Sequence, residues 1–201
     1  MMASGSETPG FKEEGFPAFL FNFDQFLKMD EAGVFADREG AIELIEGRVM
    51  TVAPASADHA NVVIDLAVNL ANALKASGVV GLKVLSQATL RIGDHSAPEP
   101  DVFVARPDHG RRFYEARDAV FVAEVSVTTV QPDQSFKRPL YARAGIPELW
   151  ILEPGQRAIH VHRHPQPDGD WGETFIVTDG VVSPLFAPEI QIALADVFGG
   201  A

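Results

Sequence analysis

The sequence predicts one α/β domain in which helices pack against a mixed β-sheet. Helical periodicity runs over residues 56–78 and again over 135–145, and apolar segments of strand length lie between and after these two helices. The order is a long helix, three strands, a second helix and further strands, which is typical of a mixed α/β sheet. With 201 residues, the chain is long enough for one domain with a hydrophobic core and too short for two domains of typical size.

The N-terminal part predicts a tail, a short helix and strand structure. The first 16 residues mix Ser, Gly, Glu and Pro without periodicity, so we expect a disordered tail over 1–16 and a single domain over 17–201. Apolar residues recur at helical spacing over 22–32, which predicts a short helix. The segment 41–52 alternates around Gly47 and predicts either a strand pair or one bent strand.

The long helix at residues 56–78 is the clearest element in the sequence. Its apolar residues form one stripe, and polar residues lie off that stripe, as expected for a helix that covers a core. The stripe consists of Val62, Val63, Leu66, Leu70 and Leu74. Either Ser56 or Asp58 can cap its start, and Gly78 can end it.

The remaining elements are strands and one short helix. We expect strands over residues 82–92, 101–105, 119–127, 148–153 and 158–164. The segment 135–145 predicts the second helix. The last two of these strands read as a hairpin, and the segment 173–183 predicts a further hairpin around an Asp-Gly turn.

Composition limits the location of the protein. No apolar run approaches the roughly 18 residues that are needed to span a bilayer. The start of the chain lacks a basic segment followed by an apolar one, which is the pattern of a secretory signal. The absence of cysteine excludes disulfides and thiolate metal sites. We therefore expect a cytoplasmic protein that does not enter a membrane.

The charge balance bears on possible partners. The chain has 16 basic and 28 acidic side chains, which give a net charge of −12. A protein that grips nucleic acid through phosphate contacts is usually basic over its contact face. The overall field therefore repels a polyanion and counts against tight non-specific binding, although binding follows local charge.

Two acids occur in apolar strand segments. Asp101 opens one strand, and Glu124 lies in the middle of the next, on the same face as Ser126 because side chains alternate along a strand. If the two strands are neighbours, the carboxylates converge at one end of the sheet, where they repel unless a proton or a cation lies between them. With oxygen ligands and no cysteine, that cation would be Mg²⁺ or Mn²⁺.

A lysine near such a site could orient or deprotonate water, or stabilise charge on a phosphate. Lys137 is the candidate, because it opens the second predicted helix, and Tyr141 would lie on the same helical face. Pro139 places Lys137 in the first turn or its lead-in, since a proline inside the helix would remove a hydrogen bond. The ordinary alternatives are a turn acid at Asp101, a structural ion pair at Glu124 and a surface lysine.

The order "PDVFV … FVAEVS … DxxxK … YARAGIPELWILEP" resembles the Uma2 family, a bacterial family assigned as endonucleases within the PD-(D/E)xK nuclease superfamily. The resemblance runs from about Phe23 to the C-terminus and is most specific over 121–154. It implies a restriction-endonuclease-like αβββαβ core with a mixed sheet, extended by C-terminal β-hairpins.

Carried over residue by residue, the resemblance assigns Asp101 to the PD motif and Glu124 to the acid of (D/E)xK. The usual lysine position holds Ser126, and Lys137 on the following helix takes its place. Glu43 matches an upstream acid and would be a further metal contact, with an edge-strand acid as the alternative. The implied catalytic set is Asp101, Glu124 and Lys137, and the implied metal ligands are Asp101, Glu124 and Glu43.

The activity implied by the resemblance is Mg²⁺- or Mn²⁺-dependent hydrolysis of phosphodiester bonds in DNA by a homodimer. Two other classes stay open. The chain could be a catalytically silent binding or interaction module that keeps the fold, which the acidic net charge favours. It could also hydrolyse a small phosphoester, which would require a narrow, closed pocket.

Four histidines have no assigned role. His59 matches the family's histidine at the start of the long helix and is expected to cap or hydrogen-bond locally rather than to bind metal. His160, His162 and His164 alternate along one predicted strand and share a face. That spacing can bind metal, but an exposed hairpin is the commoner outcome.

Overall fold

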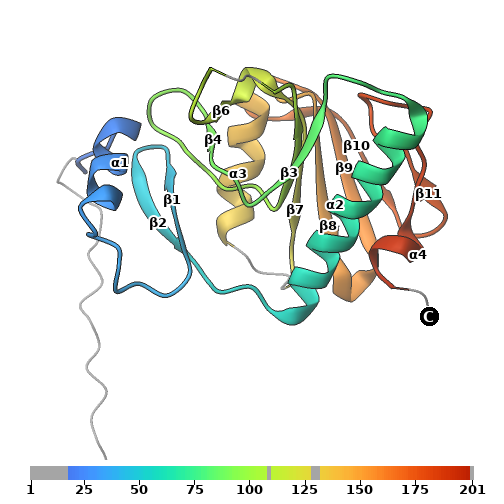
Figure 1. The fold of residues 1–201 in the computed structure, drawn as a ribbon, viewed down its shortest axis with the longest axis horizontal. Helices are drawn as coiled ribbons and strands as arrows, with labels where there is room; N and C mark the ends of the chain where they lie inside the picture. The colour runs from blue at the N-terminus through green and yellow to red at the C-terminus, as the bar shows by residue number, and fades with distance from the viewer. Residues whose placement is uncertain (1–17, 108–109, 128–131, 200–201) are drawn as a thin grey trace, which may run out of the picture.

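A six-stranded mixed sheet forms the centre of the molecule (Figure 1), with the strand order β10-β9-β8-β7-β5-β3. The computed structural model describes residues 18–107, 110–127 and 132–199, the last range with its side chains from residue 136 on. The predicted tail over 1–16 lies outside these ranges. Within them, no helix has both the length and the apolar character that a membrane span requires.

Within this sheet, only β7 and β8 run parallel, and every other neighbouring pair is antiparallel. The strands are β3 Lys83–Ser86, β5 Val102–Ala105, β7 Ala119–Val125, β8 Glu148–Glu153, β9 Ala158–Pro165 and β10 Trp171–Val177. The helices α2 Ala57–Ser77 and α3 Pro132–Arg143 complete the predicted αβββαβ core, in the order α2, β3, β5, β7, α3, β8. The fold class is therefore confirmed.

The two helices cover opposite faces of the sheet, because the residues of β7 alternate between two hydrophobic cores. Phe121 and Ala123 belong to the core beneath α2, whereas Val122 belongs to the core beneath α3. The central strands carry apolar residues on both faces, which is why β7 is buried along its full length.

Helix α2 forms where the sequence predicts it. All five residues of the predicted apolar stripe are buried. Of the two candidate caps, Ser56 is the one used, since its hydroxyl oxygen accepts a hydrogen bond from the His59 backbone N–H at 3.2 Å. Gly78 ends the helix in the left-handed conformation, with φ of 73°.

The N-terminal elements form a separate layer beside the sheet, seen in blue and cyan in Figure 1. They are α1 Phe23–Glu31, β1 Ala41–Ile45 and β2 Arg48–Val52. The strand pair is the correct alternative for 41–52, because Glu46 and Gly47 both have positive φ and form a tight hairpin turn. Leu44 joins the hairpin to the rest of the chain, since its carbonyl accepts from the Ala97 N–H at 2.7 Å.

Short elements fill the remaining connections. They are β4 Leu90–Arg91, β6 Tyr114–Glu115, β11 Val181–Val182, β12 Ile192–Ala193, α4 Leu194–Val197 and the 3-10 turns Ala116–Asp118 and Pro154–Gln156.

The single strand predicted over 82–92 is wrong. The chain forms β3 and then turns at Gln87, which has φ of 49° and donates its backbone N–H to the Pro100 carbonyl at 3.1 Å. After the turn, β4 pairs in parallel with β6 outside the main sheet. The hydrogen bond to Pro100 therefore divides the apolar run over 82–92 into two strands, and the periodicity of a strand gives no sign of such a contact.

The internal hairpin predicted over 173–183 is also wrong, although C-terminal hairpins are present. β10 pairs with β9, whereas β11 pairs with β12. The chain leaves the sheet after β10 because Val182 is buried in the core beneath α2 rather than placed along the sheet edge. Hydrophobic burial decides the direction of the chain here.

Helix α3 begins earlier than the predicted 135–145. Pro132 is its first residue, a position where the fixed φ of proline suits a helix start. Pro139 therefore lies inside the helix, and Lys137 is on the helix proper rather than on its lead-in.

Candidate active site

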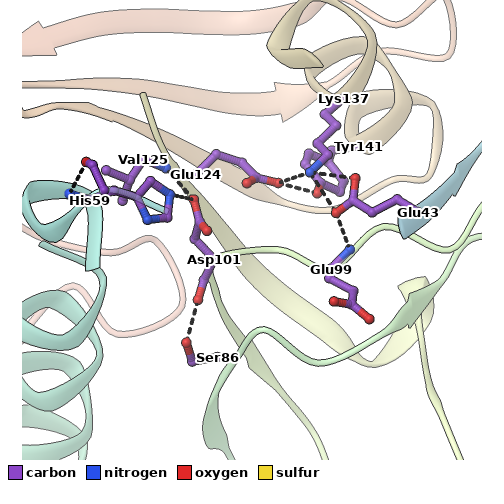
Figure 2. A network of polar contacts seen from close by, with 10 residues as sticks. Glu43, His59, Ser86, Glu99, Asp101, Glu124, Val125, Lys137 and Tyr141 are labelled. Carbon is purple, nitrogen blue, oxygen red and sulfur yellow. Dashed lines mark hydrogen bonds and ion pairs between the residues drawn. The ribbon is translucent and has the colours of Figure 1, made fainter. Parts of the chain in front are cut away.

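A pocket of about 520 Å³ lies where β1, the start of α2, the entry to β5 and the end of β7 meet. The loop from Ala53 to Ser56 forms part of its wall. Its charged and titratable side chains are those of Glu43, His59, Glu99, Asp101, Glu124 and Lys137. The structure thus brings all four predicted site residues, Glu43, Asp101, Glu124 and Lys137, to one cavity from separate parts of the chain (Figure 2).

Asp101 is held by contacts to its side chain and its backbone. Its Oδ2 atom accepts from the Val125 backbone N–H at 2.8 Å and lies 3.1 Å from Nε2 of His59. Because a carboxylate oxygen accepts hydrogen bonds, Nε2 of His59 is placed to donate in this contact. The Ser86 hydroxyl donates to the Asp101 carbonyl at 2.8 Å, which fixes the backbone at the strand entry.

Glu124 projects from β7 toward α3. Its Oε1 atom accepts a hydrogen bond from the Tyr141 hydroxyl at 2.5 Å and lies 3.7 Å from the Lys137 Nζ atom. Burial raises the pKa of Glu124 to about 8, with a lowering contribution from Lys137 and raising contributions from Asp101 and Glu43. Glu124 therefore holds its proton unless a positive charge arrives.

Lys137 is buried, with 4% of its surface exposed, and its ammonium faces Glu43. Nζ lies 2.9 Å from each carboxylate oxygen of Glu43. The Glu99 backbone N–H donates to one of these oxygens at 2.8 Å. Two buried charges are therefore compensated by each other, as the low dielectric of an interior requires.

Glu99 is a pocket residue that the sequence prediction missed. It lines the same cavity, and its pKa is raised, mainly by burial, while a hydrogen bond from Thr89 acts in the opposite direction. The available signal was its position two residues before Asp101 in "EPD", because alternate residues of an extended chain point to the same side.

The chain's donor set fits a hard divalent cation. Oδ1 of Asp101 and Oε2 of Glu124 carry no hydrogen bond among the described residues. In the same part of the chain, no three His, Cys, Asp or Glu side chains are arranged to hold an ion. Mg²⁺ is commonly held by one or two carboxylates, with water and substrate phosphate completing its shell, and this pair suits that mode.

The histidine strand lies away from this pocket. The predicted exposed trio is wrong, because His162 is buried against Trp171 and its Nδ1 lies 3.1 Å from the Thr174 hydroxyl. His164 has φ of 58°, which breaks the regular strand conformation. His160 lies 3.2 Å from a carboxylate oxygen of Glu153.

Comparisons with known proteins identify the family and the fold of the chain. The Uma2 family model, described as "Putative restriction endonuclease", matches residues 23–195. The crystal structure of "a putative nuclease belonging to DUF820" from Anabaena variabilis ATCC 29413 is similar, with a TM-score of 0.67 and 21% sequence identity. The similarity covers 89% of this chain and 97% of that chain, and at this identity it shows the fold alone. No curated protein matches the sequence. Because the family model spans most of the chain, the protein belongs to the Uma2 family.

Proposed function

We propose that the protein is a divalent-metal-dependent nuclease that hydrolyses phosphodiester bonds in DNA. The observation that carries the proposal is the shared pocket of Asp101, Glu124 and Lys137, which are far apart in the sequence. Family membership supports the nuclease class, since the description of the family is "Putative restriction endonuclease".

Asp101 and Glu124 would hold Mg²⁺ or Mn²⁺ through the oxygens that carry no protein hydrogen bond. The bound ion would acidify a water molecule and polarise the phosphate. The acids of this pocket give metal dependence an electrostatic reason. Four carboxylates line it, of which Glu43 is compensated by Lys137 and Glu124 holds its proton. The remaining two, Glu99 and Asp101, would repel an anionic phosphodiester unless a cation is bound.

Lys137 would orient the attacking water or offset the charge that develops on the phosphate. Its ammonium is held by Glu43, whose two oxygens are both 2.9 Å away. We therefore propose that Glu43, which the sequence predicts as a metal contact, acts first by holding Lys137. A contact between Glu43 and the ion would require this ion pair to open.

The direct test incubates the purified protein with supercoiled plasmid or single-stranded DNA in Mn²⁺, Mg²⁺ or EDTA. Asp101→Asn and Glu124→Gln serve as matched variants, because each keeps the side-chain shape and replaces the carboxyl group by a neutral amide. We expect cleavage by the wild type only with metal, and loss of at least 100-fold (about 2.7 kcal/mol) in both variants. Equal cleavage by wild type and variants would assign the activity to a contaminant and overturn the proposal.

A second candidate function is a catalytically silent interaction module. The net charge of −12 favours it, because the overall field opposes DNA binding. Mn²⁺ calorimetry separates the two candidates, since an interaction module has no requirement for the ion. Absence of Mn²⁺ uptake together with absence of cleavage would favour the module.

The proposal also includes action as a homodimer, as the resemblance implies, and a location in the cytoplasm, as the composition of the chain suggests. Sedimentation of the purified protein tests the assembly, since one chain has a mass of 21.7 kDa and a dimer twice that mass. A monomeric mass at working concentrations would remove the dimer from the proposal and leave the pocket chemistry unchanged.

A further inference from the structure

We infer that His59 and Tyr141 are positioning residues of the proposed metal site, each fixing one oxygen of a different carboxylate so that the other oxygen is left for the ion. This inference rests on the proposed function. The two side chains come from different helices, α2 and α3, on opposite faces of the sheet (Figure 2). His59 lines the pocket, whereas Tyr141 contacts Glu124 from the core beneath α3.

The Tyr141 contact is specific to Glu124. The tyrosine is fully buried in the core beneath α3, and its hydroxyl lies 2.5 Å from Oε1 of Glu124. The hydroxyl is the donor in this hydrogen bond, and the carboxylate oxygen accepts. Packing fixes the ring, and the ring fixes the rotation of the carboxylate.

The His59 contact is specific to Asp101. Only the backbone N–H of His59 takes part in capping α2, through Ser56, while its ring Nε2 lies 3.1 Å from Oδ2 of Asp101. The other ring nitrogen, Nδ1, is buried and has no hydrogen-bond partner among the described residues. The ring is therefore directed at the carboxylate, which differs from the local capping role expected from the sequence.

The two carboxylates have the same arrangement. Asp101 has donors on Oδ2, from Val125 and His59, and none on Oδ1 within the described ranges. Glu124 has a donor on Oε1 and, in that same part of the protein, none on Oε2. Hydrogen bonds to ligating groups orient them toward the metal, and their removal typically weakens metal affinity by about 10- to 100-fold.

The test is a titration of MnCl₂ into the full-length protein without DNA, followed by the electron paramagnetic resonance signal of free Mn²⁺. We expect Tyr141→Phe and His59→Leu each to bind Mn²⁺ about 10- to 100-fold more weakly than the wild type. His59→Gln keeps a nitrogen donor near the position of Nε2 and is expected to restore most of the affinity. Melting curves without metal check that each variant is folded.

Tyr114→Phe is the matched control, because it removes the same hydroxyl from a tyrosine that packs on Phe103 and is outside the pocket. This variant is expected to bind Mn²⁺ like the wild type. Unchanged affinity in both Tyr141→Phe and His59→Leu would overturn the inference while the metal site stands. If Tyr141→Phe does not fold, the variants His59→Leu and His59→Gln test the inference. A loss of Mn²⁺ affinity in His59→Leu that His59→Gln fails to restore would overturn the positioning role.

Failure of the proposed function gives a different result. In that case the wild type itself binds no Mn²⁺, so there is no metal site and the positioning role is overturned as well. A wild type that binds Mn²⁺, with graded losses across His59→Gln, His59→Leu and Tyr141→Phe, supports both.

Discussion

At the scale of single residues, Lys137 is the cation on which the buried acids of the pocket depend. It lies 2.9 Å from both oxygens of Glu43 and 3.7 Å from Glu124, and all three side chains are buried. Removing one partner of a buried ion pair leaves an uncompensated charge, which is costlier than replacing the whole pair by neutral groups.

We therefore predict that Lys137→Met lowers the free energy of unfolding by about 3–5 kcal/mol. The double variant Lys137→Met/Glu43→Gln should lose less than Lys137→Met alone, because it removes the unpaired charge as well. Urea denaturation of both proteins measures this. Equal losses in the single and double variants would mean that the ion pair does not couple these two side chains.

His162 provides a prediction on pH. Burial lowers its pKa to about 4, with Arg138 and His160 acting in the same direction. The pKa of His162 is therefore about 6.5 in the unfolded chain and about 4 in the folded protein. Between these two pH values, the unfolded chain binds a proton at this residue and the folded protein does not. Stability from this residue is complete above pH 6.5 and is lost as the pH falls toward 4.

We expect His162→Gln to flatten the pH dependence of the melting temperature between pH 6.5 and 4, relative to the wild type. His164→Gln is the control, since that histidine is exposed and its substitution should leave the profile unchanged. Parallel profiles for wild type and His162→Gln would contradict the buried, neutral state of this side chain.

At the scale of elements, the β1–β2 hairpin carries Glu43 into the pocket, and its turn restricts the sequence. Gly47 has φ of 79°, and a Cβ atom there would lie 2.7 Å from Cβ of Leu20. Gly93 has φ of 60°, but a Cβ atom added there would meet open space. Substitution at Gly93 therefore has the cost of a positive φ without the close contact.

We predict that Gly47→Ala destabilises the protein by more than about 1 kcal/mol, and by more than Gly93→Ala does. Hydrogen exchange should show loss of protection in 41–52 in the first variant and unchanged protection in α2. Equal destabilisation by the two substitutions would show that the contact with Leu20 contributes nothing beyond backbone strain.

At the scale of the whole molecule, binding of an ion to the folded state alone raises stability. Mn²⁺ at 100 times its dissociation constant should add about 2.7 kcal/mol to the free energy of unfolding. We expect a higher melting temperature with Mn²⁺ in the wild type and no shift in Asp101→Asn. A shift of equal size in both proteins would place the bound ion outside this pocket.

The sequence predicts the core of this molecule well because local patterns and burial agree there. The stripe of α2 and the buried strand with Glu124 both follow periodicity, and the family motif points to Asp101 and Lys137. The errors share one cause, which is tertiary contact. The turn at Gln87 depends on Pro100, and the burial of His162 depends on packing that no local pattern reports.

The position of Lys137 on α3 has a consequence for how the protein is made. The ribosome adds Glu43 and Glu124 first, and the ammonium of Lys137, which lies 2.9 Å from Glu43 and 3.7 Å from Glu124, follows later in the chain. A nascent chain that stops before α3 lacks the cation that lies between Glu43 and Glu124 in the folded protein. Assembly of the pocket thus waits for translation of α3, and a product that ends before this helix would lack the buried ion pair between Lys137 and Glu43.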